Sequence, residues 1–198
     1  MARTTIQKQR RRQILQALHQ RLLIKPFDKT SIKEIAAEAG LNHGMLHYYF
    51  KSKEDILLAY IDYQTALYKK AFTRWLDANR KQLSQEDGLI TAPFDFMEQE
   101  ITFDRDLSKI FIEIWEISIY NEKVKEKLKD MYRAWITTFA SHLAELIDDH
   151  KKAYALSALM VSFSEGLSLL SVILDDSDLS FGTLYQMFKN LIPPSKIG

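Results

Sequence analysis

The 198-residue chain has the composition of a globular protein, with 46% hydrophobic and 27% charged residues and only six Gly and four Pro to interrupt helices. It contains no Cys, which excludes disulfides, zinc-thiolate sites and thiol nucleophiles and agrees with the cytoplasm as its location. The net charge of +1 conceals an asymmetry, because residues 1–53 carry eleven Lys or Arg against three Asp or Glu, whereas residues 54–198 have a net charge of −7. A small basic module of this kind is typical of contact with a polyanion.

The basic module has the pattern of three amphipathic helices. Apolar residues at helical spacing predict a first helix over residues 7–23. Ser31 and Glu34 form the capping-box pattern that opens a second helix. After a very short turn containing glycine, Asn42 is a suitable N-cap for a third helix over residues 43–50. Two short helices joined in this way predict a helix-turn-helix.

Helical patterns continue through the acidic remainder, so we predict an all-α chain of about nine helices. A cap at Ser52 opens a long fourth helix over residues 54–76, and a loop is expected over residues 80–93, which contain Gly88 and Pro93. Further helices are predicted over residues 94–103, 106–120, 122–150, 153–174 and 181–192. We predict two domains, residues 1–53 and residues 54–198.

Residues 153–174 are the one stretch long and apolar enough to raise the possibility of a membrane span. Glu165 lies near its middle and five Ser residues reduce its hydrophobicity, so insertion would be costly. We therefore expect a helix buried inside a protein and no membrane association.

Residues 30–57 resemble the DNA-binding signature of the TetR family of transcription regulators. The matching residues in the second helix and the turn are Ser31, Ile32, Ile35, Ala36, Ala39, Gly40, Leu41 and Asn42. Those in the third helix and the start of the fourth are Gly44, Leu46, Tyr49, Phe50, Lys53, Glu54 and Leu57. The resemblance implies a DNA-binding domain in residues 1–53 and an effector-binding and dimerisation domain in residues 54–198.

Within this resemblance the third helix is the recognition helix, whose first residues reach base edges in the major groove. We expect base or sugar contacts from His43, Met45 and Tyr48, with Gly44 permitting close approach. Contacts to phosphates are expected from Thr30 or Ser31, Asn42, His47, Tyr49, Lys51 and Lys53. Further backbone or minor-groove contacts could come from Arg3, Lys8, Arg10, Arg11 and Arg12.

Two positions depart from the family's usual pattern. Met45 stands where a small hydroxyl residue is commoner, and His47 replaces a Tyr that typically touches the DNA backbone. An operator sequence therefore cannot be transferred to this chain from a relative.

The second domain resembles the family less closely, and within the family it is most similar to the subgroup of choline-responsive betaine regulators. The residues that carry this likeness are Phe111, Glu113, Trp115, Ser118, Val124, Leu128, Tyr132 and Trp135. The family's effector cavity implies a set of candidate lining residues, most of which we expect to be core: Trp75, Phe96, Phe103, Phe111, Trp115, Trp135, Phe139, Phe163 and Glu165. Glu165 could face a cationic ligand, pair across a dimer or reach solvent.

The last two helices are expected to pack with those of a second copy as an intersubunit four-helix bundle. Their candidate interface residues are Leu156, Met160, Leu167, Leu170, Leu184, Met187, Phe188 and Leu191.

The resemblance thus implies a homodimeric transcription regulator, a repressor that a small-molecule effector releases from a palindromic DNA operator. No cofactor is expected. A helical enzyme is disfavoured, because the five His form no metal-ligand cluster and no glycine loop for phosphate is present. The remaining alternative is a DNA-localised interaction protein of the nucleoid-occlusion kind that has no effector.

Overall fold

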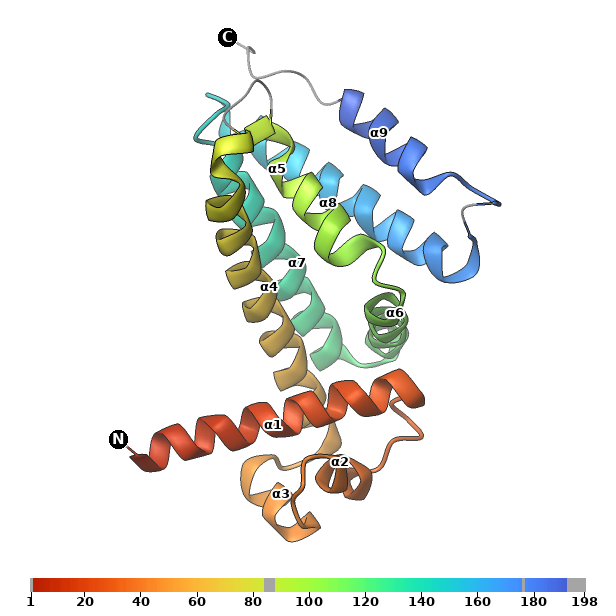
Figure 1. The fold of residues 1–198 in the computed structure, drawn as a ribbon. Coiled ribbons are helices and arrows are strands. Elements are labelled where there is room, and N and C mark those ends of the chain that lie inside the picture. Colours follow the sequence, from red (N-terminus) through yellow and green to blue (C-terminus); the bar gives the residue numbers. More distant parts are fainter. Residues whose placement is uncertain (1, 84–87, 176, 192–198) are drawn as a thin grey trace. The chain divides into compact units, whose positions relative to one another are not determined.

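The structure, a computed structural model, describes residues 2–83, 88–175 and 177–191, and these residues form nine α-helices and one π-helical turn with no strand (Figure 1). The predicted all-α class is confirmed. The elements are α1 (Ala2–Ile24), α2 (Ile32–Glu38), α3 (His43–Tyr49), α4 (Lys53–Leu83), α5 (Gly88–Met97), the π-helical turn η1 (Glu98–Thr102), α6 (Arg105–Tyr120), α7 (Glu122–Leu143), α8 (His150–Ile173) and α9 (Phe181–Leu191).

Contacts divide the chain into two compact units. Unit 1 comprises Met1–Ala66 and Ile110–Met131, and unit 2 comprises Leu67–Lys109 and Tyr132–Gly198. Helices α4, α6 and α7 each contribute residues to both units. We predicted the domain boundary after residue 53 from binding roles, whereas the two units are defined by contacts within the chain. The boundary therefore stays a prediction.

In unit 1 the sequence signals for α2 and α3 form as predicted. Ser31 Oγ accepts from the Glu34 amide at 3.2 Å and the Glu34 carboxylate accepts from the Ser31 amide at 2.8 Å, which completes the capping box. Gly40 turns the chain after α2 with φ of 62°, a left-handed conformation that favours glycine. Asn42 Oδ1 then caps α3 by accepting from the Met45 amide at 2.7 Å.

Helix α1 holds this helix-turn-helix together from one side (Figure 1). Its buried face packs with Ile35, Leu46 and Phe50, which are almost completely buried. Hydrogen bonds also join α1 to the C-terminal ends of α2 and α3. Gln13 Nε2 donates to the Ala39 carbonyl and Arg11 donates to the Tyr49 carbonyl, each at 2.6 Å. The rigid placement of α3 therefore depends on α1.

The predicted loop over residues 80–93 is wrong. Helix α4 continues to Leu83 and α5 begins at Gly88, so Pro93 lies inside a helix; residues 84–87 are outside the described residues. Proline has no N–H to donate to the carbonyl four residues earlier, which here is that of Leu89. A ring nitrogen of His142 lies 2.8 Å from that carbonyl oxygen and replaces the missing donor. His142 is half-buried in this role.

The single helix predicted over residues 122–150 is also wrong, since α7 ends at Leu143 and α8 begins at His150. Asp149 starts the new helix, with Oδ1 accepting from the amides of Lys151 at 2.9 Å and Lys152 at 3.1 Å. The N-cap at Asp149 outweighed the apparent continuity of the helical pattern.

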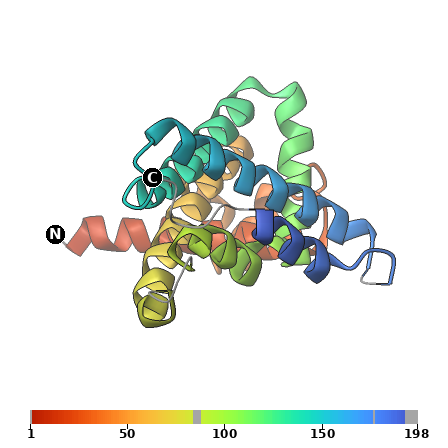
Figure 2. The same ribbon diagram turned by 90° about the horizontal axis from the view of Figure 1, so that it is seen from above.

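In unit 2, aromatic stacking joins α5, α8 and α9. The Phe94 and Tyr185 rings stack at 3.8 Å, those of Phe163 and Phe188 stack at 4.0 Å, and the Tyr185 hydroxyl donates to the Phe94 carbonyl. Figure 2 shows α8 and α9 side by side, as these contacts require. By length and composition alone α8 could cross a membrane, although a third of its most apolar stretch is buried within the protein.

Candidate functional site

Helix α3 presents one exposed face to solvent. His43, Gly44, His47 and Tyr48 are exposed, Tyr48 to 64%, whereas Leu46 on the opposite face is completely buried. Met45 is also exposed, to 42%. The predicted base-contacting and backbone-contacting residues of this helix therefore share the one face that a DNA duplex could reach.

Gly44 leaves space on that face. A Cβ atom built at Gly44 would lie 3.5 Å from Asn42 Oδ1, an ordinary van der Waals distance, so packing inside the chain does not require glycine here. The predicted role of Gly44, a close approach of DNA to the helix backbone, stays a prediction.

The other predicted phosphate contacts fall into two groups. Ser31, Asn42 and Lys51 are exposed, and Tyr49 is half-buried with its ring 5.0 Å from the Tyr48 ring. Thr30 is only 1% exposed and its hydroxyl donates to the Pro26 carbonyl at 3.0 Å. Of the alternatives Thr30 and Ser31, only Ser31 lies at the surface.

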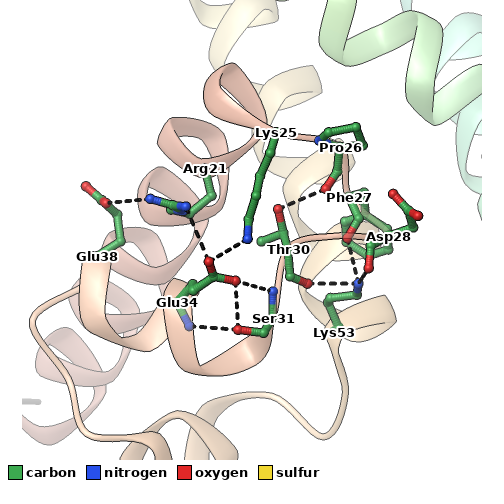
Figure 3. A network of polar contacts seen from close by, with 10 residues as sticks. All are labelled: Arg21, Lys25, Pro26, Phe27, Asp28, Thr30, Ser31, Glu34, Glu38 and Lys53. Atoms are coloured by element: carbon green, nitrogen blue, oxygen red, sulfur yellow. Dashed lines mark hydrogen bonds and ion pairs between the residues drawn. The ribbon is translucent and has the colours of Figure 1, made fainter.

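Lys53 is engaged inside unit 1 (Figure 3). Its ammonium donates to the carbonyls of Phe27 at 2.6 Å and Thr30 at 2.9 Å, with a longer contact to the Asp28 carbonyl at 3.3 Å. It also lies 4.3 Å from the centre of the Phe27 ring. Loss of hydration lowers the pKa of Lys53, and the nearby carboxylates of Asp28 and Glu113 oppose that shift.

This geometry gives Lys53 a positioning role in the free protein. It joins the start of α4 to residues 27–30, the segment that leads into the α2 cap. For the same ammonium to contact a phosphate, as the sequence predicts, it would have to leave these carbonyls.

Two carboxylates that the DNA-binding signature did not single out fix the same segment. Glu113 of α6 accepts from the Phe27 amide, and burial raises its pKa while this hydrogen bond lowers it. Glu34 joins the Ser31 cap to Lys25 and Arg21, and chiefly the Lys25 contact lowers the pKa of Glu34 to about 2. The role of Glu113 emerges only from a tertiary contact, because Glu113 is 86 residues from Phe27 in the chain. The sequence predicted the Glu34 cap but not its contacts with Lys25 and Arg21.

The nine candidate effector residues are divided between the two units. Phe111 and Trp115 belong to unit 1, where Trp115 is 51% exposed, and the other seven belong to unit 2. Three of those seven, Phe96, Trp135 and Phe139, form an aromatic cluster. Phe72, a residue that the sequence analysis did not select, joins it through contacts with Phe96 and Phe139. Trp75 packs against Phe96 at 6.0 Å and donates to Gln99, and Phe163 belongs to the stack with Phe188.

Glu165 lies in an unusual setting. Solvent reaches this side chain, yet protein atoms crowd around it, and the loss of hydration raises its pKa to about 7 although a hydrogen bond with Tyr132 opposes the shift.

Unit 2 contains a cavity of about 360 Å³, within the size range of small-molecule sites. Its lining residues come from the start of α6, the end of α8 and the start of α9: Phe103, Arg105, Ser171, Phe181 and Gly182. Of the predicted effector residues, Phe103 alone appears among them. Arg105 is the charged member of this lining, and it also donates to the Leu174 carbonyl at 3.1 Å.

The candidate dimer residues differ widely in exposure. Leu170, Met187 and Leu191 are exposed, Leu156, Leu184 and Phe188 are half-buried, and Met160 and Leu167 are buried within the chain. The exposed apolar face of α8 also includes residues that the sequence analysis did not select, namely Tyr154, Leu159, Leu169 and Ile173.

A capped two-helix unit with a short glycine turn, an exposed second helix and a basic flank defines a helix-turn-helix DNA-binding protein. Residues 14–60 match the family described as "Bacterial regulatory proteins, tetR family". This match shows the family for the DNA-binding segment of the chain, residues 14–60.

Relatives and solved structures agree with this assignment. An HTH-type transcriptional regulator from the dhlA 5′ region of Xanthobacter autotrophicus is 28% identical over 149 residues, 74% of this chain and 72% of the relative. A TetR-family regulator from Rhodococcus sp. has a similar fold, with a TM-score of 0.71, 20% identity and coverage of 94% of this chain and 100% of that one. A regulator from Saccharomonospora viridis, solved with choline, has a TM-score of 0.68 and 23% identity over 93% of this chain and 96% of that one.

Proposed function

We propose that the chain is a repressor that binds a palindromic operator as a homodimer and leaves it when a small molecule binds unit 2. The observation that carries the DNA-binding part is the exposed face of α3, where His43, Met45 and Tyr48 stand together at the end of a basic module. The cytoplasm is the compartment that this function requires.

Dimerisation through α8 and α9 is supported by their exposed apolar side chains. Leu169 and Ile173 lie one helical turn apart, and Leu191 of α9 is 79% exposed. We expect a second copy of the chain to cover these apolar side chains, because a palindrome is read by two recognition helices roughly 34 to 36 Å apart. The same surface accounts for the high hydropathy of α8 without a membrane.

The cavity at Phe103, Arg105 and Phe181 is our candidate for the effector site. Aromatic walls and one guanidinium favour an organic anion with an apolar body. A cationic ligand at Glu165 remains the competing prediction from the sequence.

Thermal shift with two sets of probes distinguishes these effector classes. Aromatic and aliphatic carboxylates should raise the melting temperature of the wild-type protein, and Gly182→Leu should abolish the effect by filling the cavity. A Cβ at Gly182 has open space around it, so the variant should fold. Stabilisation by choline that Glu165→Gln abolishes, with no response to carboxylates, would instead favour the site at Glu165.

A nucleoid-occlusion role without an effector and an enzymatic role are not favoured by any feature of these residues. In the described part of the chain, no three His, Asp or Glu side chains gather as a metal centre would require.

Selection of bound duplexes from a random pool tests the proposed function. Wild-type protein should enrich an inverted repeat with half-sites one helical turn apart or a multiple of it, and Tyr48→Ala should change or lose that preference. Failure of the folded wild-type protein to enrich any sequence would overturn the proposal.

A further inference from the structure

Two histidines form a pair on the exposed face of α3. His43 and His47 are four residues apart and therefore lie one above the other on the helix. Both side chains are exposed, their rings meet edge to face with centroids 4.7 Å apart, and the two Nε2 atoms are 3.3 Å apart.

This separation matches the edge of a tetrahedral metal site. Zinc binds imidazole nitrogen at roughly 2.0–2.1 Å, and two such bonds at the tetrahedral angle place the nitrogens roughly 3.3–3.4 Å apart. The Nε2 atoms of His43 and His47 therefore need no rearrangement of the helix to bind one ion.

We propose that His43 and His47 bind a divalent transition-metal ion through their Nε2 atoms, with Zn²⁺ as the ion that fits their spacing. Without metal, one Nε2–H can donate to the other Nε2. On binding, that proton moves to Nδ1 of the same ring and the side chains rotate so that both Nε2 lone pairs can bind the ion, with no net proton released. Water fills the two remaining positions, and imidazole ligands select against hard ions such as Mg²⁺.

The position of the pair gives the ion a consequence, and this second step rests on the proposed function. His43 and His47 lie on the face of α3 that would enter the DNA groove. A hydrated ion there occupies the space and the nitrogen atoms that a duplex would use. Metal binding and DNA binding should therefore weaken each other by the same factor, since coupling between two binding equilibria is reciprocal.

Calorimetric titration of Zn²⁺ into the DNA-free protein tests the site itself. We expect one ion per chain for the wild type and for His150→Ala, which removes an exposed histidine at the start of α8. His43→Ala and His47→Ala should each bind at least about tenfold more weakly, because losing a ligand costs no less than losing a supporting contact. Mg²⁺ should give no heat.

A rearranged variant provides the matched control. His47→Tyr combined with Tyr48→His keeps the composition but moves one histidine off the shared face, and it should lose the site. Equal zinc uptake by this variant and the wild type, or no uptake by the wild type, overturns the proposal.

Titration of a fluorescent duplex with and without Zn²⁺ tests the consequence. Zinc should lower the duplex affinity of the wild type and leave that of His43→Ala unchanged relative to the same variant without metal. If zinc binds but wild-type duplex affinity does not fall, the competition is wrong. Duplex binding without metal reports separately on the proposed function.

Discussion

Replacing Lys53 by Met separates a positioning role from a phosphate contact, because Lys51 two residues earlier provides a matched exposed lysine. The Lys53 ammonium donates to two partly buried carbonyls, those of Phe27 and Thr30, and to the exposed one of Asp28. Hydrogen bonds from a charged group contribute about 1.5–3 kcal/mol each when buried. Since the site is only half-buried and the Asp28 contact is long, we count half of that value for two bonds.

The expected loss of stability for Lys53→Met is therefore about 1.5–3 kcal/mol, which for a chain of this length lowers the melting temperature by roughly 3–12 °C. Duplex affinity should fall because the segment into α2 is no longer fixed. The slope of log affinity against log salt should stay unchanged, because no phosphate contact is lost.

Lys51→Met should behave in the opposite way. Its free energy of unfolding should stay within about 0.5 kcal/mol of the wild type, while the salt slope becomes shallower by about 0.9 for each phosphate that Lys51 neutralises. Calorimetry on free protein and fluorescence anisotropy between about 50 and 200 mM salt measure both quantities. An unchanged melting temperature with a shallower slope for Lys53→Met would refute the positioning role.

Three further predictions follow from other parts of the chain. Gly44→Ala should stabilise the free protein by up to about 1 kcal/mol, since a Cβ fits there, while weakening duplex binding; equal or tighter binding would show that α3 does not approach DNA at Gly44. Leu169→Glu with Ile173→Glu should give monomers by light scattering, whereas Ile119→Glu, at an exposed apolar position in unit 1, should not; a dimer that survives the double change excludes this face of α8. Because the pKa of Glu165 rises from 4.5 to about 7 on folding, the folded state holds its proton more tightly and stability should fall as pH rises across that interval; Glu165→Gln should lack this fall, and parallel stability curves would contradict the shift.

The sequence predicted unit 1 well because its signals are local. A capping box at Ser31, a glycine with positive φ at Gly40 and a cap at Asn42 each act within a few residues, and all three form. Local signals failed where a distant partner decides the outcome. Pro93 predicted a loop, but the ring of His142 satisfies the carbonyl that proline leaves unpaired, and the helix persists.

The sequence could not predict the role of Lys53 for the same reason. A lysine at the start of a helix beside a DNA-binding motif is typical of a phosphate contact. Nothing local reveals that three carbonyls 23 to 26 residues earlier accept hydrogen bonds from its ammonium group. The burial of individual apolar residues in α8 could not be predicted either. Met160 and Leu167 are apolar, as Leu169 and Ile173 are, but they face the interior.

Aromatic residues illustrate the same limit at the candidate effector site. Periodicity places Phe96, Trp135 and Phe139 on the inner faces of their helices, but an inner face packs against protein or borders a cavity according to how the neighbouring helices fit. Here these three rings pack against one another, and Phe72 packs against Phe96 and Phe139. One cavity lies beside Phe103 and Arg105, near the start of α6, the end of α8 and the start of α9. The effector site that we propose therefore lies at helix ends and not along the aromatic stripes.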